Sequence, residues 1–475
     1  MFELLKFLLV CIIVYAAYIL VFAFLPYFLP KKISEEFKKE VDSYDFYGDR
    51  PCVDRVALVE DPLISLATRI RLINEAEKTL DIAYYALHMG QTTDFFLASV
   101  LDAAQRGVRV RFLIDGMFHG FSGEYKYLAA ALGSHPNIEI KLYNRINPLK
   151  PWTFNGRMHD KYIIVDNRIM LLGGRNIGDK YFGGEDYCEN LTIDRDVMVY
   201  NTEYDTQCRQ SVLFDVRKYM LNIWDNKIAK TSFAKRSKKS EEQQKRLFGI
   251  MKELRESSRE LFVTPLNLDI RTHKANKVTF FANDHAIYKK EPKVGYIIKH
   301  IAATAKKRVF LQSPYVVLSE NIYQSLKEVG EQPAEYEILT NSMHSSPNLP
   351  AFSLYMSDRK KILDTGAKIY EFHGDDSIHA KTYIIDDRMS IIGSFNMDPR
   401  SEYIDTEIML AIDSVGFTAT LENIINQYKN YSLCIDSKGA YDLSESEECY
   451  DDEDSKKKKF LKIVGKVISP FRILI

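Results

Sequence analysis

The 475-residue sequence has no excess of either charge and no cysteine spacing typical of a metal site. Lysine and arginine number 64 against 65 aspartates and glutamates, so no overall basic field favours nucleic acid as a partner. The six cysteines show no C-x-x-C or mixed Cys/His pattern, which argues against zinc and requires no disulfides in a chain this long. The apolar content of 46% is ample for the cores of two or three domains.

Charge is also absent from residues 7–29, FLLVCIIVYAAYILVFAFLPYFL. As a helix this run is about 35 Å long, enough to cross the hydrocarbon core of a bilayer. No small-x-small cleavage site follows, so we expect a single membrane anchor rather than a cleaved signal peptide. More lysines follow the run than precede it, but single N-terminal anchors adopt both orientations, so the side of the membrane on which the rest of the chain lies stays open.

One pattern occurs twice in the chain. Residues 157–176 read RMHDKYIIVDNRIMLLGGRN, and residues 377–396 read SIHAKTYIIDDRMSIIGSFN. Both have the form H-x-K-x4-D-x6-G-[GS]-x-N, and seven of the eighteen positions from His to Asn are identical. The repeat predicts two related halves, each carrying one copy.

The spacing within each copy predicts a β-hairpin. His159 and Lys161, two residues apart, project from the same face of a strand. A two-residue turn at 167–168 would place His159 opposite Asn176 and Lys161 opposite Gly174. A turn at Asp387-Arg388 gives the second copy the same arrangement, with His379 opposite Asn396 and Lys381 opposite Ser394. Such a ring of His, Lys and Asn is a cationic, hydrogen-bonding pocket suited to a phosphoryl group.

The aspartates of the motif, Asp166 and Asp386, fall at the two turns. We expect each to hold its turn through a hydrogen bond or to pair with a lysine or arginine. As members of the repeated motif, both also stand among the candidate catalytic residues.

Helices and strands alternate on both sides of each motif. In the first half we expect helices at 63–78 and 93–105 and strands at 79–87, 108–115, 138–143 and 196–200. In the second half we expect a helix at 295–305 and strands at 308–311, 336–340, 368–371 and 407–413. This alternation predicts an α/β fold of two pseudo-twofold-related lobes, each a β-sheet flanked by helices, with both pockets at the interface. The expected units are an anchor at 1–30, a polar linker at 31–55, a first lobe at 56–213, a helical connector at 214–265, a second lobe at 266–430 and a tail at 431–475.

Paired HxKxxxxD motifs followed by GGRN and GSFN resemble the phospholipase D superfamily, and within it the bacterial cardiolipin synthases with one N-terminal anchor. LVEDP at 58–62, GVRVRFLIDG at 107–116, HPNIEIKLYN at 135–144 and NMDPRSEYIDTE at 396–407 add to the resemblance. It covers roughly residues 55–430. The sequence departs from the pattern at Gly174, where serine is more usual, and at Asp405, where these synthases often carry asparagine.

The residue types suit a phosphodiester, which needs a nucleophile, an acid for the leaving group and cationic neutralisation. We expect His159 to form a phosphatidyl-histidine intermediate while His379 protonates the departing alcohol. The resemblance favours the first histidine as nucleophile, but the pseudo-symmetry leaves the choice open. Phosphoryl oxygens would be held by Lys161, Lys381, Asn176 and Asn396, above a floor of Gly174 and Ser394. The resemblance also implies acids that orient the histidines, and Asp196 and Glu407 match by position. Because lysines neutralise the charge, no metal or cofactor is required.

The expected function is that of a cell-membrane phosphatidyltransferase that makes cardiolipin from phospholipids, with phosphatidylglycerol as the acceptor. A phospholipase D-type hydrolase of phospholipid, or less readily of nucleic acid, is one alternative, and an inactive membrane scaffold is another. Intact motifs in both halves argue against the scaffold, and the neutral net charge argues against a nuclease. Water or alcohol as acceptor, the identity of the donor and any protein partner are not predicted.

The tail changes character along its length. An acidic segment at 445–454 precedes a lysine run at 456–459 and the apolar, basic sequence FLKIVGKVISPFRILI. Such a tail either lies on an anionic membrane surface as a second contact or is a frayed, solvated end.

Overall fold

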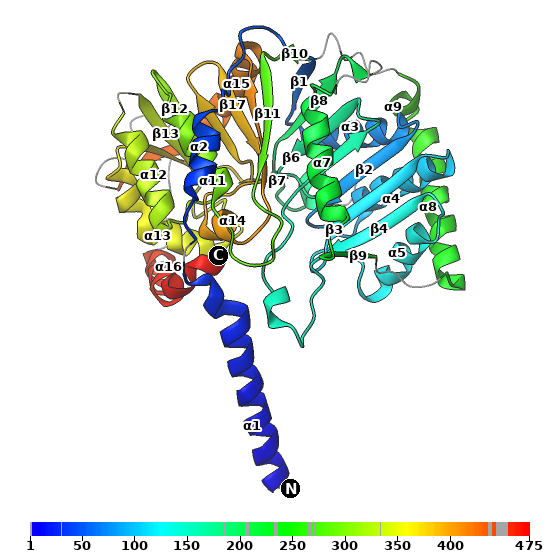
Figure 1. Ribbon diagram of the computed structural model, residues 1–475, viewed down its shortest axis with the longest axis horizontal. Coiled ribbons are helices and arrows are strands. Elements are labelled where there is room, and N and C mark those ends of the chain that lie inside the picture. Colours follow the sequence, from blue (N-terminus) through cyan, green and yellow to red (C-terminus); the bar gives the residue numbers. More distant parts are fainter. Residues whose placement is uncertain are drawn as a thin grey trace.

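The fold is that of a computed structural model, which describes residues 2–29, 31–184, 187–204, 209–231, 236–264, 268, 272–332, 334–435, 439–442 and 455–475. In this part of the chain, two lobes stand side by side, each built on a nine-stranded sheet, and a long helix projects from the base of the body (Figure 1). The expected α/β fold with paired lobes is confirmed.

The first sheet has the strand order β10-β1-β8-β6-β5-β2-β3-β4-β9. These strands are β1 (Asp54–Val59), β2 (Thr79–Tyr84), β3 (Arg109–Asp115), β4 (Ile138–Tyr143), β5 (Tyr162–Val165), β6 (Ile169–Gly173), β8 (Asp196–Asn201), β9 (Ala229–Thr231) and β10 (His273–Lys274). Strands β2, β3 and β4 run parallel, and β5, β6, β8 and β1 follow them antiparallel. One face is covered by α3 (Pro62–Asn74), α4 (Gln91–Gln105) and α5 (Lys126–Gly133), which enclose the first core.

The second sheet repeats this plan in the order β11-β18-β17-β16-β12-β13-β14-β19-β20. These strands are β11 (Lys277–Ala282), β12 (Arg308–Gln312), β13 (Glu335–Asn341), β14 (Lys368–Phe372), β16 (Thr382–Ile385), β17 (Met389–Gly393), β18 (Ile408–Asp413), β19 (Ser432–Ile435) and β20 (Tyr441–Asp442). Its core packs beneath α11 (Lys293–Ala302), α12 (Glu320–Gly330) and α13 (Leu349–Leu363). The sequence repeat is therefore a repeat of topology.

A third core joins the lobes. It combines apolar side chains of both sheets with α7 (Val212–Trp224) and α15 (Val415–Asn430). Helix α7 packs on β11 of the other lobe, and α15 packs on β1. Below this core, β7 (Thr192–Ile193) and β15 (Ser377–Ile378) pair in parallel across the interface. Because β15 leads directly into His379, the interface positions that histidine.

Each motif forms the expected hairpin, but the predicted register is wrong by one residue. Val165 lies opposite Ile169, so the turn comprises residues 166–168, and Lys161 accepts a hydrogen bond from Gly173 N–H. The second hairpin shows the same slip. Its cause is positive φ angles at the turn, 53° at Asp166 and again at Asp386, which Asp tolerates and which accommodate a third turn residue.

Two segments expected as linkers belong to the lobes. The segment 214–265, expected as a helical connector, does contain helices, but α7 closes the interface core and α8 (Lys238–Ser257) packs into the first core through Leu247, Met251 and Leu254. The expected linker at 31–55 contains α2 (Glu35–Asp42), and its Val41 and Phe46 lie in the second core. Both segments are rich in charged residues, so the few apolar residues that enter the cores were not recognised from the sequence.

The projecting helix α1 (Phe2–Ile19) continues through a π-helical turn, Leu20–Phe24, and a 3-10 turn, Leu25–Tyr27. Over Phe2–Tyr27 the mean hydropathy reaches 2.9 and nearly all side chains are exposed, so length and composition suit a membrane span.

The upper part of α1 is held by the loop that precedes the first motif. Asn155 Nδ2 donates to the carbonyl of Ala23 at 2.7 Å, a backbone acceptor in the π-helical turn. The rings of Phe22 and Trp152 meet edge to face. Two further hydrogen bonds, from the hydroxyls of tyrosines in α1 to loop carbonyls, join Tyr15 to Pro148 and Tyr18 to Leu149.

The last described segment is α16 (Ser455–Ile468) followed by a 3-10 turn, Ser469–Leu474. Both lie at the base of the second lobe, next to the point where α1 leaves the body (Figure 1). The acidic segment at 445–454 lies outside the described residues.

Candidate active site

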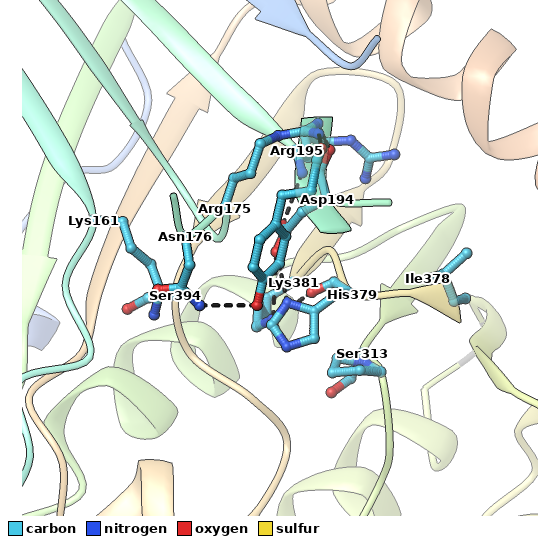
Figure 2. Close-up of polar contacts among 12 residues, drawn as sticks. Lys161, Arg175, Asn176, Asp194, Arg195, Ser313, Ile378, His379, Lys381 and Ser394 are labelled. Carbon is cyan, nitrogen blue, oxygen red and sulfur yellow. Dashed lines mark hydrogen bonds and ion pairs between the residues drawn. The ribbon is translucent and has the colours of Figure 1, made fainter. Parts of the chain in front are cut away.

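The two motif histidines lie at the interface, and each pairs with a carboxylate of the opposite lobe. His159 Nδ1 is 3.0 Å from a carboxylate oxygen of Glu407. His379 Nδ1 is 2.6 Å from Asp194 Oδ2, and Figure 2 shows this carboxylate above the imidazole. A carboxylate at Nδ1 fixes the tautomer and orientation of the ring and leaves Nε2 as the reactive nitrogen. The crossed pairing means that each half-site requires both lobes.

Asp196, predicted to orient a histidine, has a different role. Its carboxylate accepts hydrogen bonds from Arg69 at 2.9 and 3.0 Å, from Arg175 at 3.2 Å and from Ser65 at 2.7 Å. All of these side chains are buried. Asp196 is therefore the centre of an ion-pair cluster inside the first lobe, and the orienting acid that the prediction missed is Asp194.

Strand register would have identified Asp194. Gly174 N–H donates to Arg195 O, and Ser394 N–H donates to Ile408 O. The two acceptors are equivalent in the two lobes, so the residues that precede them, Asp194 and Glu407, are equivalent as well. The loops between Asn and acid differ in length, which is why counting along the sequence selected the wrong aspartate.

Gly174 and Ser394, expected on the floor of the pocket, lie against these two acids. A Cβ on Gly174 would come 2.3 Å from Asp194 Oδ1, so this acid requires a residue without a side chain. At the equivalent position the Ser394 hydroxyl donates to Glu407, whose longer side chain reaches its histidine from a greater distance. Glycine at position 174, where serine is more usual, thus occurs together with aspartate at the position that is equivalent to Glu407.

The two motif lysines are buried beside their histidines. Lys161 Nζ donates to the carbonyl of His159, and Lys381 Nζ donates to that of His379. Lys381 Nζ also lies 2.7 Å from His379 Nδ1. Burial lowers the pKa of Lys161 to about 7 and that of Lys381 to about 8. A bound phosphodiester anion would favour their charged forms.

In the site without substrate, the pKa of both histidines lies below its usual value. Burial and then Lys381 lower the pKa of His379 to about 4, although Asp194 opposes this. Burial and then Lys161 and Lys381 place the pKa of His159 well below its usual value.

The two asparagines differ. Asn176 Oδ1 accepts from Ala86 N–H at 3.2 Å, and its Nδ2 donates to the hydroxyl of Tyr181 at 3.1 Å, the dashed line beside Asn176 in Figure 2. Asn396 is buried, and its Oδ1 has no hydrogen-bond partner among the described residues. Asn176 is thus fixed in place, whereas the amide of Asn396 is available to a bound group.

Aromatic rings that were not predicted from the sequence stand beside both histidines. Tyr85 meets the His159 ring edge to face at 4.9 Å between centroids and lies 5.0 Å from Lys161 Nζ. Tyr181 stands similarly beside His379, at 6.3 Å. A single tyrosine in an apolar stretch is not distinctive, so only the fold reveals these contacts.

The carboxylates of Asp166 and Asp386 lie at the hairpin turns and are taken up by backbone N–H groups. Asp166 accepts hydrogen bonds from three successive backbone N–H groups, those of residues 77–79, and Asp386 does the same for residues 306–308. Each ties its hairpin turn to the start of the neighbouring strand. Seven residues of extended chain, roughly 20 Å, separate Asp166 from His159. These aspartates hold the turns, as the alternative expectation stated.

Two lobes that share crossed His–carboxylate pairs, each with a lysine, define a site of the phospholipase D type. A family model described as "Cardiolipin synthase, PLD-like domain" matches residues 69–210 and 297–429, more than half of the chain and one motif in each part. The chain belongs to this family.

Similar proteins cover most of the chain. Cardiolipin synthase C of Escherichia coli strain K12 is 28% identical over 397 residues, 75% of this chain and 80% of that protein. An uncharacterized protein of Helicobacter pylori strain J99 is 26% identical over 408 residues, 78% of each. The crystal structure of phosphatidylserine synthase from Haemophilus influenzae has the same fold, with a TM-score of 0.63 at 14% identity over 93% of this chain and 100% of that one.

Proposed function

We propose that the protein is a membrane-bound phosphatidyltransferase that joins two phospholipids into cardiolipin, with phosphatidylglycerol as the acceptor. The observation that carries this proposal is the pair of histidines, each oriented by an acid of the opposite lobe and each with a buried lysine beside it, in a chain that resembles a cardiolipin synthase over three quarters of its length. The apolar helix α1 supports a single-pass location in the membrane.

The two carboxylates support a division of labour between the histidines. Although burial opposes it, Lys381 and His379 hold the pKa of Asp194 well below its usual range, so this acid is an anion. Burial raises the pKa of Glu407 to about 8 despite Lys161, so this acid holds its proton more readily than Asp194 does. A full negative charge beside His379 favours the imidazolium there. His379 is therefore assigned as the acid, and His159 as the nucleophile.

The reaction then has two steps. His159 Nε2 forms a bond to phosphorus while the bond from phosphorus to the leaving alcohol breaks, and His379 gives its proton to the departing oxygen. The hydroxyl of the acceptor lipid next loses its proton to His379 and attacks phosphorus, and the P–N bond breaks. Lys161 and Lys381 stabilise the charge that develops on the phosphoryl oxygens in both steps.

The test is lipid analysis of a bacterial host that lacks cardiolipin and expresses the full chain. Wild-type protein and the His300→Ala variant, in which a surface histidine near Asp42 is lost, should both produce cardiolipin, and His159→Ala should not. Phosphatidic acid without cardiolipin would show hydrolysis instead of transfer. Equal cardiolipin from wild type and His159→Ala would refute the mechanism. A phospholipid adduct mapped to His379 by mass spectrometry would reverse the two roles.

A further inference from the structure

Helix α16 presents two different apolar faces. One face is buried against α13. There Leu461 is only 1% exposed, and Gly465 packs so closely that a Cβ would lie 2.5 Å from the carbonyl of Ser353. This contact fixes α16 on the body of the second lobe and decides which of its residues point outward.

The outward face carries four large apolar side chains. Phe460, Ile463, Val467 and Phe471 are 60, 62, 67 and 49% exposed. Their spacing of three, four and four residues puts them in one line along the helix and the turn that follows. We call this line the outer stripe. A row of exposed aromatic and branched side chains marks a surface that is covered in the working state.

The outer stripe is continuous with the base of the anchor. Phe471, its last member, packs edge to face against Phe28, with ring centroids 6.3 Å apart. Ile473 and Leu474 pack against the fully buried Tyr27. Figure 1 shows α16 beside the point where α1 leaves the body. If α1 crosses a bilayer, the outer stripe begins at the surface of that bilayer.

The same helix bears positive charge on the flank of the stripe. Lys459, Lys462 and Lys466 are exposed, and helical spacing places them on one side of the outer stripe. The sequence of α16 contains no acidic residue. A row of lysines next to a row of apolar side chains is the arrangement of helices that lie in the plane of a membrane containing anionic lipid.

We propose that α16 and the turn after it lie in the headgroup layer, with the outer stripe among the acyl chains and the lysines on anionic headgroups. This surface is a second membrane contact, separate from α1, and it rests on the membrane location proposed above. Together the two contacts fix the tilt of the body, which a single helix cannot do.

The docked segment also reaches the active site. Arg400 Nη1 donates to the carbonyl of Leu474 at 3.3 Å, and Arg400 Nε donates to Asp405 at 2.9 Å. Asp405 in turn accepts from the backbone N–H of Arg157, two residues before His159. The turn after α16 is thus joined through three hydrogen bonds to the chain that leads into the first catalytic motif, so docking of this turn bears on the segment that carries His159.

The experiment places an environment-sensitive fluorescent side chain at single positions of the full-length protein in lipid nanodiscs. Position 463 reports on the outer stripe, position 466 is the matched control on the lysine flank, and position 12 reports on the anchor. Quenching by lipids brominated on the acyl chain is measured with phosphatidylcholine alone and with added phosphatidylglycerol. Positions 12 and 463 should be quenched severalfold more strongly than position 466. The difference between 463 and 466 should increase with phosphatidylglycerol.

Two results would overturn the proposal. Quenching at 12 with none at 463 beyond that at 466 would keep the anchor and remove the second contact. No quenching at any position would refute the contact together with the membrane location. Self-quenching between labels at 463 without bromine quenching would show that another copy of the chain covers the outer stripe, which also contradicts the proposal. Lys462→Glu combined with Lys466→Glu should abolish the dependence on phosphatidylglycerol and leave the thermal stability unchanged.

Discussion

The change Asp194→Asn should impair catalysis while the fold persists. The substitution keeps the shape of the side chain but removes the charge that lies 2.6 Å from His379 Nδ1. A hydrogen bond to a charged group contributes about 1.5 to 3 kcal/mol. If that stabilisation applies to the transition state, kcat falls about 10- to 150-fold, since about 1.36 kcal/mol is one decade.

The pH profile separates this effect from simple damage. Asp194 raises the pKa of His379 against the larger effect of burial. Without the charge of Asp194 the pKa of His379 falls further, so His379 loses its proton at a lower pH than it does in the wild type. The basic limb of the kcat profile should therefore move to lower pH. We would measure kcat from pH 3 to 9 on phospholipid in mixed micelles.

Asp196→Asn is the matched control, because it lies two residues away and has no contact with a histidine. It leaves Arg69 and Arg175 with one anion fewer in a fully buried cluster, which should cost about 3 to 5 kcal/mol of stability. Its Tm should fall, but the pH profile of kcat, measured on the protein that remains folded, should match that of the wild type. A shifted profile in Asp196→Asn with an unchanged profile in Asp194→Asn would refute the assignment of the orienting acid.

Three more substitutions test other parts of the site. Gly174→Ser should push Asp194 away from His379 and lower kcat about 10²-fold, and unchanged kinetics would show that the acid has room to move. Glu407 has a folded pKa of about 8 against 4.5 in the unfolded chain, so its contribution to stability is present below pH 4.5 and is lost as pH rises towards 8. Glu407→Gln should therefore flatten the Tm-versus-pH curve in that window, and a parallel curve would contradict the raised pKa. Asp166→Ala should lower the free energy of unfolding by about 1 to 3 kcal/mol, measured in urea, with kcat per folded molecule unchanged; a catalytic defect without loss of stability would return Asp166 to the site.

Much of this architecture follows from local patterns in the sequence. The repeat gave the two lobes, and the alternation of apolar segments located most of the central strands, β4 without error at 138–143. The spacing H-x-K identified the histidines and lysines because two residues of extended chain always share a face. These features depend on residues that are close together in the chain, so they can be predicted from the sequence alone.

What the sequence did not predict depends on contacts between distant segments. The choice between Asp194 and Asp196 is made by the register of β8 against β6, and the loops before β8 and β18 differ in length. The one-residue slip in the hairpins depends on positive φ at Asp166 and Asp386, which the motif alone does not specify. Tyr85 stands beside His159 because β2 pairs with β5, although the two strands are far apart in the sequence. Each of these is decided by packing in three dimensions, where sequence spacing carries no information.

Because the loop 145–156 contacts α1 and the turn after it through specific side chains, the anchor cannot have just any hydrophobic sequence. Asn155 donates to a backbone carbonyl that lies in the π-helical turn, and Trp152 packs against the aromatic ring of Phe22. A generic hydrophobic helix grafted in place of α1 would still insert into a bilayer but would supply neither partner. The chain that leads to Arg157 and the first motif would then lose its outer support. Replacing α1 with another membrane helix should therefore change the conformation of the loop 145–156. A soluble fragment made by deleting α1 should differ from the full chain in the same loop.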